Sequence, residues 1–133
     1  MDYLEFETLD FNQRKGGGGV QMPKNIFSVT TNGKCTSKVR FSKELTMEVE
    51  KYKYLSVKRN PITSQDYLVF NNDEGMNICF CKKDVRAGVA CKQFCEYLRK
   101  KYGNGEVRFH VEISENKSNS TKYATYEIIG KVV

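Results

Sequence analysis

Four cysteines come nearest to a metal-binding pattern in this sequence. Cys79 and Cys81 are two residues apart on an expected strand, and Cys91 and Cys95 are four apart on an expected helix, so each pair shares one face. Four thiolates would suit zinc. However, the spacing matches no common zinc motif, and the second pair belongs to the apolar side of its helix, where thiols act as small hydrophobic groups. We therefore predict no metal site, with zinc as the alternative.

Residues that could carry out catalysis are scarce. His110 is the only histidine, and no serine or cysteine lies in a nucleophile motif. The glycine run at 16–19 is not a phosphate-binding loop, because no Lys-Ser or Lys-Thr pair follows it. These observations predict a protein that binds a partner without catalysis and without a cofactor. An enzyme built on Cys79, Cys81 or His110 is the alternative.

Basic residues alternate with tyrosines in two blocks, and this combination is typical of sequence-tolerant binders of single strands. If Leu55 and Val57 face the core, then Tyr54, Ser56 and Lys58 face outward on the other side of the same strand. Tyrosine-rich surfaces also occur at oligomer interfaces. The residues that we predict to contact nucleic acid are Lys34, Lys38, Arg40, Lys51, Lys53, Tyr54, Lys58, Arg59, Lys82, Lys83 and Arg86.

The charge of the 133-residue chain is unevenly distributed around its net value of +6. Residues 1–10 contain four acids and no base, whereas residues 11–59 contain eleven bases against three acids. Residues 82–101 contain seven bases against two acids. Local basic blocks indicate an anionic partner, because the local field attracts it more than the total charge does. Lysines that merely solvate exposed faces would give the same pattern.

Several protein classes are excluded by composition. No stretch approaches the roughly 18 apolar residues of a membrane span, and the N-terminus lacks the basic start and apolar run of a secretory signal. Five cysteines are an odd number, which argues against a disulfide framework and for reduced thiols. We therefore expect a cytoplasmic protein that does not contact a membrane.

The elements that must position these residues follow from hydrophobic periodicity. Alternating runs predict strands at 27–30, 39–41, 54–58, 67–70, 76–81, 107–113 and 123–129. Within 107–113, valine and phenylalanine are expected to face inward. Ser42 is a plausible N-cap for a short helix over 43–51, with Leu45 and Val49 on one face. The fold class is α+β: a mainly antiparallel sheet, one main amphipathic helix at about 89–102 packed on it, and a C-terminal β-hairpin.

Two segments are expected along the chain. Residues 1–19 form an acidic N-terminal arm with a Gly-rich hinge, and residues 20–133 form a single α+β domain. The arm is too short to fold alone. It packs on the body, packs on a neighbouring protomer, or stays loose.

One part of the sequence resembles a known family. The stretch Asn32-Gly33-Lys34, then Val39 to Leu45, then Tyr54-Leu55-Ser56-Val57 resembles swapped-hairpin DNA-binding domains of the AbrB/MazE/SpoVT type within residues 32–70. Ser42 replaces the expected proline, and residues 35–38 look like an insertion. The resemblance implies an intertwined homodimer that grips DNA with Lys34, Lys38, Arg40 and Lys43.

The prediction is thus a non-catalytic protein that binds DNA or RNA by electrostatic and aromatic contacts and forms a homo-oligomer. The alternative is a self-assembling structural or adaptor protein, a phage or bacterial accessory subunit whose N-terminal arm docks on a neighbouring protomer.

Overall fold

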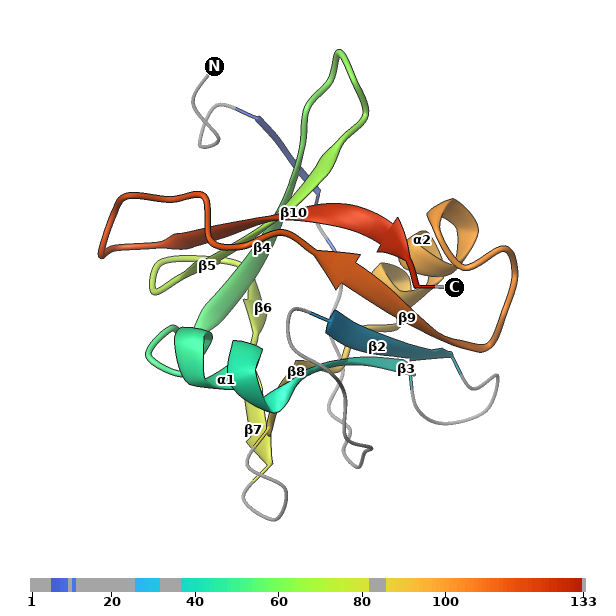
Figure 1. Ribbon diagram of the computed structural model, residues 1–133, viewed down its shortest axis with the longest axis horizontal. Coiled ribbons are helices and arrows are strands. Elements are labelled where there is room, and N and C mark those ends of the chain that lie inside the picture. The colour runs from blue at the N-terminus through green and yellow to red at the C-terminus, as the bar shows by residue number, and fades with distance from the viewer. Residues whose placement is uncertain (1–5, 10, 12–25, 32–36, 82–85, 133) are drawn as a thin grey trace.

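The structure is a computed structural model that describes residues 6–9, 11, 26–31, 37–81 and 86–132 (Figure 1). In this part of the chain, ten strands form one antiparallel sheet accompanied by two helices, which confirms the α+β class. The strands are β1 (Glu7–Leu9), β2 (Ile26–Thr31), β3 (Ser37–Phe41), β4 (Tyr54–Arg59), β5 (Asp66–Asn71), β6 (Met76–Asn77), β7 (Cys79–Cys81), β8 (Arg86–Val89), β9 (Arg108–Ile113) and β10 (Ala124–Lys131). The helices are α1 (Lys43–Val49) and α2 (Lys92–Lys101).

The sheet bends around its own core. Its strand order is β1-β4-β5-β10-β9-β2-β3-β8-β7. The long strand β10 joins the two halves, because its first part pairs with β5 and its last part with β9, with a register shift between Ile128 and Gly130 (Figure 1). The stretch 76–81 closes the sheet, since β6 pairs with β4 and β7 pairs with β8. Each strand therefore has an inner face toward the core and an outer face.

The core is built from the inward-facing residues that alternation predicts. Phe27, Phe41, Phe70 and Tyr126 come from four different strands, and all four are fully buried. Their rings meet edge to face, with centroids 6.4, 5.3 and 5.6 Å apart in that order. The apolar stripe of α2 completes the core with Phe94, Cys95 and Leu98, together with the N-cap residue Cys91. The predicted place of Cys91 and Cys95 on the apolar side of the helix is confirmed.

Helix α1 begins at Lys43 as predicted but ends at Val49 instead of residue 51, and α2 begins later than predicted. Ser42 is the N-cap of α1, and its Oγ accepts a hydrogen bond from the Leu45 backbone N–H at 3.2 Å. The second helix begins at Lys92 instead of about residue 89, because residues 86–89 form the unpredicted strand β8. Val89 pairs with Val39 of β3 and is buried, so tertiary pairing overrides the helical pattern there.

The C-terminal hairpin is present, because β9 and β10 pair antiparallel. Phe109, Val111 and Ile113 face inward as expected, but Val107 lies before β9 and is 51% exposed. Val107 was therefore wrongly assigned to the core. The stretch Asn32-Gly33-Lys34, which begins the family resemblance, lies outside the described residues. Within those residues, no helix is both long and apolar enough to cross a membrane.

The described part of the arm packs on the body of its own chain. Strand β1 extends the edge of β4, with Glu7 opposite Arg59 and Leu9 opposite Val57. Phe6 is buried, with its ring 5.2 Å from that of Tyr67. The hinge at 16–19 lies outside the described residues, and the division into an arm and a domain stays a prediction.

Candidate nucleic-acid interface

The predicted contact residues do not form one patch. Lys51 and Lys53 are exposed just before β4, whereas Lys58 and Arg59 lie at the other end of that strand. The Lys51 ammonium lies 5.2 Å from the ring centroid of Tyr52. Among the predicted residues, Lys34, Lys82 and Lys83 lie outside the described part of the chain.

The outer face of β4 is not the open platform that was predicted. Ser56 and Lys58 do point away from Leu55 and Val57, but Ser56 is only 5% exposed and Lys58 only 8%. The arm and the 72–75 loop approach this face. Thr8 Oγ1 accepts a hydrogen bond from Lys58 Nζ at 2.7 Å, and Ser56 Oγ donates one to the Glu74 carbonyl at 2.9 Å. The expectation that Tyr54, Ser56 and Lys58 form an exposed row is therefore wrong, because long-range contacts cover the strand; Tyr54 itself is half-buried.

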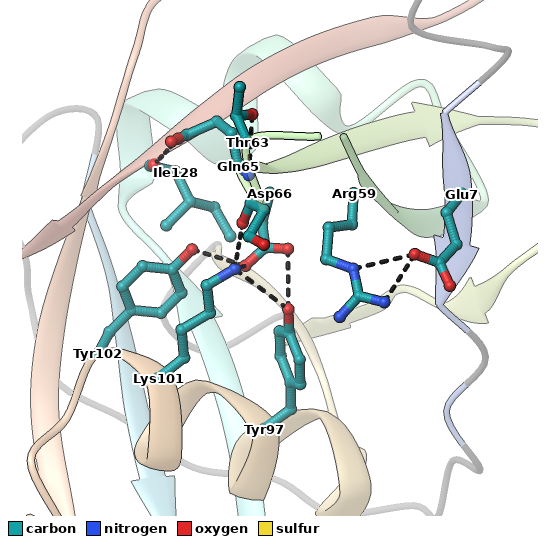
Figure 2. A network of polar contacts seen from close by, with 10 residues as sticks. Glu7, Arg59, Thr63, Gln65, Asp66, Tyr97, Lys101, Tyr102 and Ile128 are labelled. Atoms are coloured by element: carbon teal, nitrogen blue, oxygen red, sulfur yellow. Dashed lines mark hydrogen bonds and ion pairs between the residues drawn. The ribbon is translucent and has the colours of Figure 1, made fainter. Parts of the chain in front are cut away.

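Arg59, the residue after Lys58, forms an ion pair with Glu7 of the arm. Its Nε and Nη2 donate hydrogen bonds to Glu7 Oε2 at 3.0 and 2.6 Å, and this carboxylate raises the pKa of the guanidinium. Beyond this ion pair, Tyr97, Lys101 and Tyr102 reach from α2 and its C-terminus to the fully buried Asp66 (Figure 2). The Asp66 carboxylate accepts from both tyrosine hydroxyls, at 2.9 and 2.6 Å, and lies 2.8 Å from Lys101 Nζ. This cluster fastens α2 to the β4–β5 hairpin.

A different surface gathers basic residues: the outer face of the four neighbouring strands β8, β3, β2 and β9. On each strand every second residue is buried in the core, for example Val39 and Phe41 on β3 and Phe109 and Val111 on β9. Alternation then places the intervening side chains on the outer face. We name this surface the basic face and define it by Ser28, Thr30, Lys38, Arg40, Arg86, Arg108 and His110.

The strand register orders the basic face in two lateral rows. In one row, Ser28 of β2 pairs with Arg40 of β3 on one side and with His110 of β9 on the other. In the next row, Thr30 pairs in the same way with Lys38 and Arg108. Neighbouring strands are about 5 Å apart, so Lys38 and Arg108 are about 10 Å apart at the backbone, on either side of a hydroxyl.

The side chains of the basic face differ in accessibility. Arg108 is exposed, and Lys38, His110, Ser28 and Thr30 are half-buried. Arg40 and Arg86 are only 5% and 3% exposed. The prediction that a ligand contacts Arg40 and Arg86 therefore does not fit their burial. Their charges still add to the potential above the face.

The chemistry of this face suits phosphate groups. Arginine and lysine bind phosphate oxygens by charge-assisted hydrogen bonds, and serine and threonine hydroxyls add neutral ones. Among the described residues of these four strands, Glu112 is the only acid whose side chain shares the face. The face contains no described phenylalanine, tyrosine or tryptophan, so the predicted aromatic stacking has no support there.

The sulfur and imidazole groups lie apart. Cys91 and Cys95 are buried in the core, whereas Cys79 is exposed on β7. Desolvation raises the pKa of both core thiols, that of Cys95 to about 12. Among the described residues, no three histidine, cysteine, aspartate or glutamate side chains are close enough together to hold a metal ion.

Sequence reasoning missed Arg108 and His110 as site residues. The alternation in 107–113 places both on the outer side of their strand, and that signal was available. The adjacency of β9 to β2 was not, because it depends on a pairing between residues about 80 positions apart. Comparisons with known protein families, with curated proteins and with solved structures found no match for this chain.

Proposed function

We propose that this protein binds DNA or RNA through the basic face, mainly at the phosphate backbone and without catalysis. The observation that carries the proposal is the row Lys38–Thr30–Arg108, which offers two cations and a hydroxyl on one face of the sheet. Contacts to phosphate position a nucleic acid without reading its sequence. Binding that tolerates many sequences is therefore expected.

The burial pattern supports this face over the predicted contacts at Lys58 and Arg59. Lys58 and Arg59 are occupied by the arm, whereas Arg108 is exposed and its charge is accessible to a ligand. Lys51 and Lys53 are also exposed, but they precede β4 and do not belong to the basic face. The proposal therefore assigns the main contacts to Lys38 and Arg108.

A salt titration tests the proposal. Fluorescence anisotropy of labelled single- and double-stranded oligonucleotides is measured against the full chain from about 50 mM salt upward. Each phosphate that a cation neutralises releases counterions, so the logarithm of the affinity should fall linearly with the logarithm of the salt concentration. Replacement of Arg108 by glutamate should weaken binding to all sequences alike. Failure of every oligonucleotide to bind at about 50 mM salt would overturn the proposal.

Self-assembly through the arm is a second candidate, favoured by one observation. The contacts of β1 with β4 include the Glu7–Arg59 ion pair, which joins the acidic arm to a basic residue of the body. The same contacts can form between two copies of the chain when the arms are exchanged. Deletion of residues 1–15 should then dissociate an oligomer observed by light scattering. A full-length chain that is already monomeric would contradict this function.

The resemblance to swapped-hairpin domains adds a homodimer as a proposal of its own. Here β3, β4 and β5 belong to the continuous sheet of one chain, and α1 connects β3 to β4. Light scattering of the full chain tests the dimer independently of nucleic-acid binding.

A further inference from the structure

Lys58 is a buried cation for which the described residues supply only a neutral partner. Its side chain lies on the outer face of β4, and the residue is only 8% exposed to solvent. The ammonium donates one hydrogen bond, to Thr8 Oγ1 at 2.7 Å. No described carboxylate lies within ion-pair distance of it, in contrast to Arg59 and Lys101. Two of its three N–H groups therefore have no protein acceptor in the described part of the chain.

Such an arrangement is unfavourable without a further ligand. The Lys58 ammonium loses part of its hydration, because the residue is only 8% exposed, and the Thr8 hydroxyl supplies no counter-charge. Buried lysines are accordingly found with a counter-charge in nearly all proteins. A bound anion would supply both the charge and the missing hydrogen-bond acceptors.

The space for an anion is present next to this residue. Lys58 lines a cavity of about 220 Å³ together with Ser56, Val69, Asn71 and Tyr123. Asp73, Glu74 and Lys122 complete the lining, and all three are exposed in contrast to the buried Lys58. The cavity thus has the Lys58 cation in its covered part, whereas the two carboxylates and the Lys122 cation lie in its exposed part.

We infer that this cavity binds a small organic carboxylate whose charge neutralises the Lys58 ammonium. A carboxylate carries one charge and two acceptor oxygens, which match the two remaining N–H groups of Lys58. A phosphate dianion fits less well, because Asp73 and Glu74 line the same cavity and repel a second negative charge. Val69 contributes an apolar wall for the carbon atoms of the ligand. This site lies on β4 and β5 and does not depend on the basic face.

Acetate is the probe for the experiment. Its binding to the full chain is measured by nuclear magnetic resonance titration and by thermal unfolding, at constant ionic strength, with chloride and phosphate as comparison anions. We expect saturable acetate binding, and unfolding temperatures that rise with acetate concentration more than with either comparison anion. An intermolecular Overhauser effect between the acetate methyl protons and the Val69 methyl groups should place the ligand in this cavity.

Variants separate the site from a general ionic effect. Lys58→Met keeps the length of the side chain without the charge, and should weaken acetate binding at least tenfold while circular dichroism shows a folded chain. Lys53→Met is the matched control, because Lys53 is exposed one residue before the same strand, and it should bind acetate like the wild type.

Three results would overturn the inference: no saturable acetate binding to the wild type, equal effects of acetate and phosphate, or unchanged binding in Lys58→Met. Should Lys58→Met fail to fold, the Overhauser effect in the wild type decides, because its absence at saturation excludes this cavity. Loss of acetate binding with intact oligonucleotide binding would separate this site from the proposed function.

Discussion

Lys38 and Arg108 share a single cross-strand partner. Thr30 of β2 pairs with Lys38 of β3 on one side and with Arg108 of β9 on the other, although the two basic residues are 70 positions apart in the sequence. The shared partner fixes the two cations on one face of the sheet, because residues that pair across antiparallel strands point to the same side.

This relationship predicts equal and additive losses of nucleic-acid binding. Lys38→Gln and Arg108→Gln should each reduce the salt slope of the affinity by about one, and the double variant by about two, because each replacement removes one phosphate contact. Anisotropy titrations at several salt concentrations measure these slopes. Lys92→Gln, an exposed position on α2, is the control and should leave the slope unchanged. A single variant that abolishes binding at every salt concentration would contradict additive phosphate contacts.

Replacement of Asp66, the buried carboxylate of the β4–β5 hairpin, should destabilise the fold. Asp66→Asn removes the charge that Lys101, Tyr97 and Tyr102 share, and we expect a loss of about 3 kcal/mol in the free energy of unfolding. Urea denaturation measures it. The control is Glu127→Gln, which breaks the exposed ion pair with Lys117 and should cost less than about 1 kcal/mol. Equal losses in the two variants would show that the cluster does not fasten α2.

The buried phenols predict a loss of stability in alkaline solution. Burial, followed by the hydrogen bond to Asp66, raises the pKa values of Tyr97 and Tyr102, and burial next to Glu48 raises that of Tyr126. A raised folded-state pKa means that the unfolded chain loses its phenolic protons first. The stabilisation is complete below the ordinary tyrosine pKa of about 10 and is lost as the pH rises above it.

Unfolding free energies between pH 8 and pH 11 measure this decline. Tyr102→Phe should make the decline shallower, because a phenylalanine has no proton to lose. Tyr123→Phe, at a half-buried position on the outer surface, is the comparison. A decline of the same steepness in wild type and Tyr102→Phe would contradict the assignment.

The thiols of Cys79, Cys91 and Cys95 should differ in their reactivity. Cys79 is exposed, whereas Cys91 and Cys95 are buried and burial raises their pKa values. Because the thiolate is the reactive form, iodoacetamide at neutral pH should alkylate Cys79 rapidly and the two core thiols only after unfolding. Peptide mass spectrometry measures each site. Rapid alkylation of Cys95 in the native protein would contradict its place in the core.

Gly103, which follows α2, lies close to the ring of Phe109, and this contact predicts the effect of one added methyl group. A Cβ at Gly103 would lie 2.5 Å from Cε1 of Phe109, so the ring must move. Gly103→Ala should therefore cost about 1–3 kcal/mol of stability, as overpacking does elsewhere. The double variant Gly103→Ala/Phe109→Leu should lose less stability than the sum of the losses of the two single variants, because the smaller leucine side chain removes the clash. Additive losses would contradict the steric explanation.

The periodicity of the sequence determined most of the secondary structure and the inner face of each element. Hydrophobic alternation locates β2, β4, β5 and β9 within a few residues, and the helix expected at about 89–102 corresponds to α2, with Cys91 and Cys95 buried on its apolar side. Ser42 was recognised as an N-cap because capping depends on residues only three positions apart. Such features arise from local interactions, which the order of residues alone specifies.

Tertiary structure decided which outer faces are accessible and which strands are neighbours. Alternation placed Lys58 opposite the core, but the contact with Thr8, 50 positions away, turned an expected surface residue into a buried cation. Arg108 became a neighbour of the Lys38 row only because β9 pairs with β2. Alternation along a strand distinguishes its two faces, whereas strand adjacency and the covering of an outer face depend on contacts between distant segments, and these set the candidate sites.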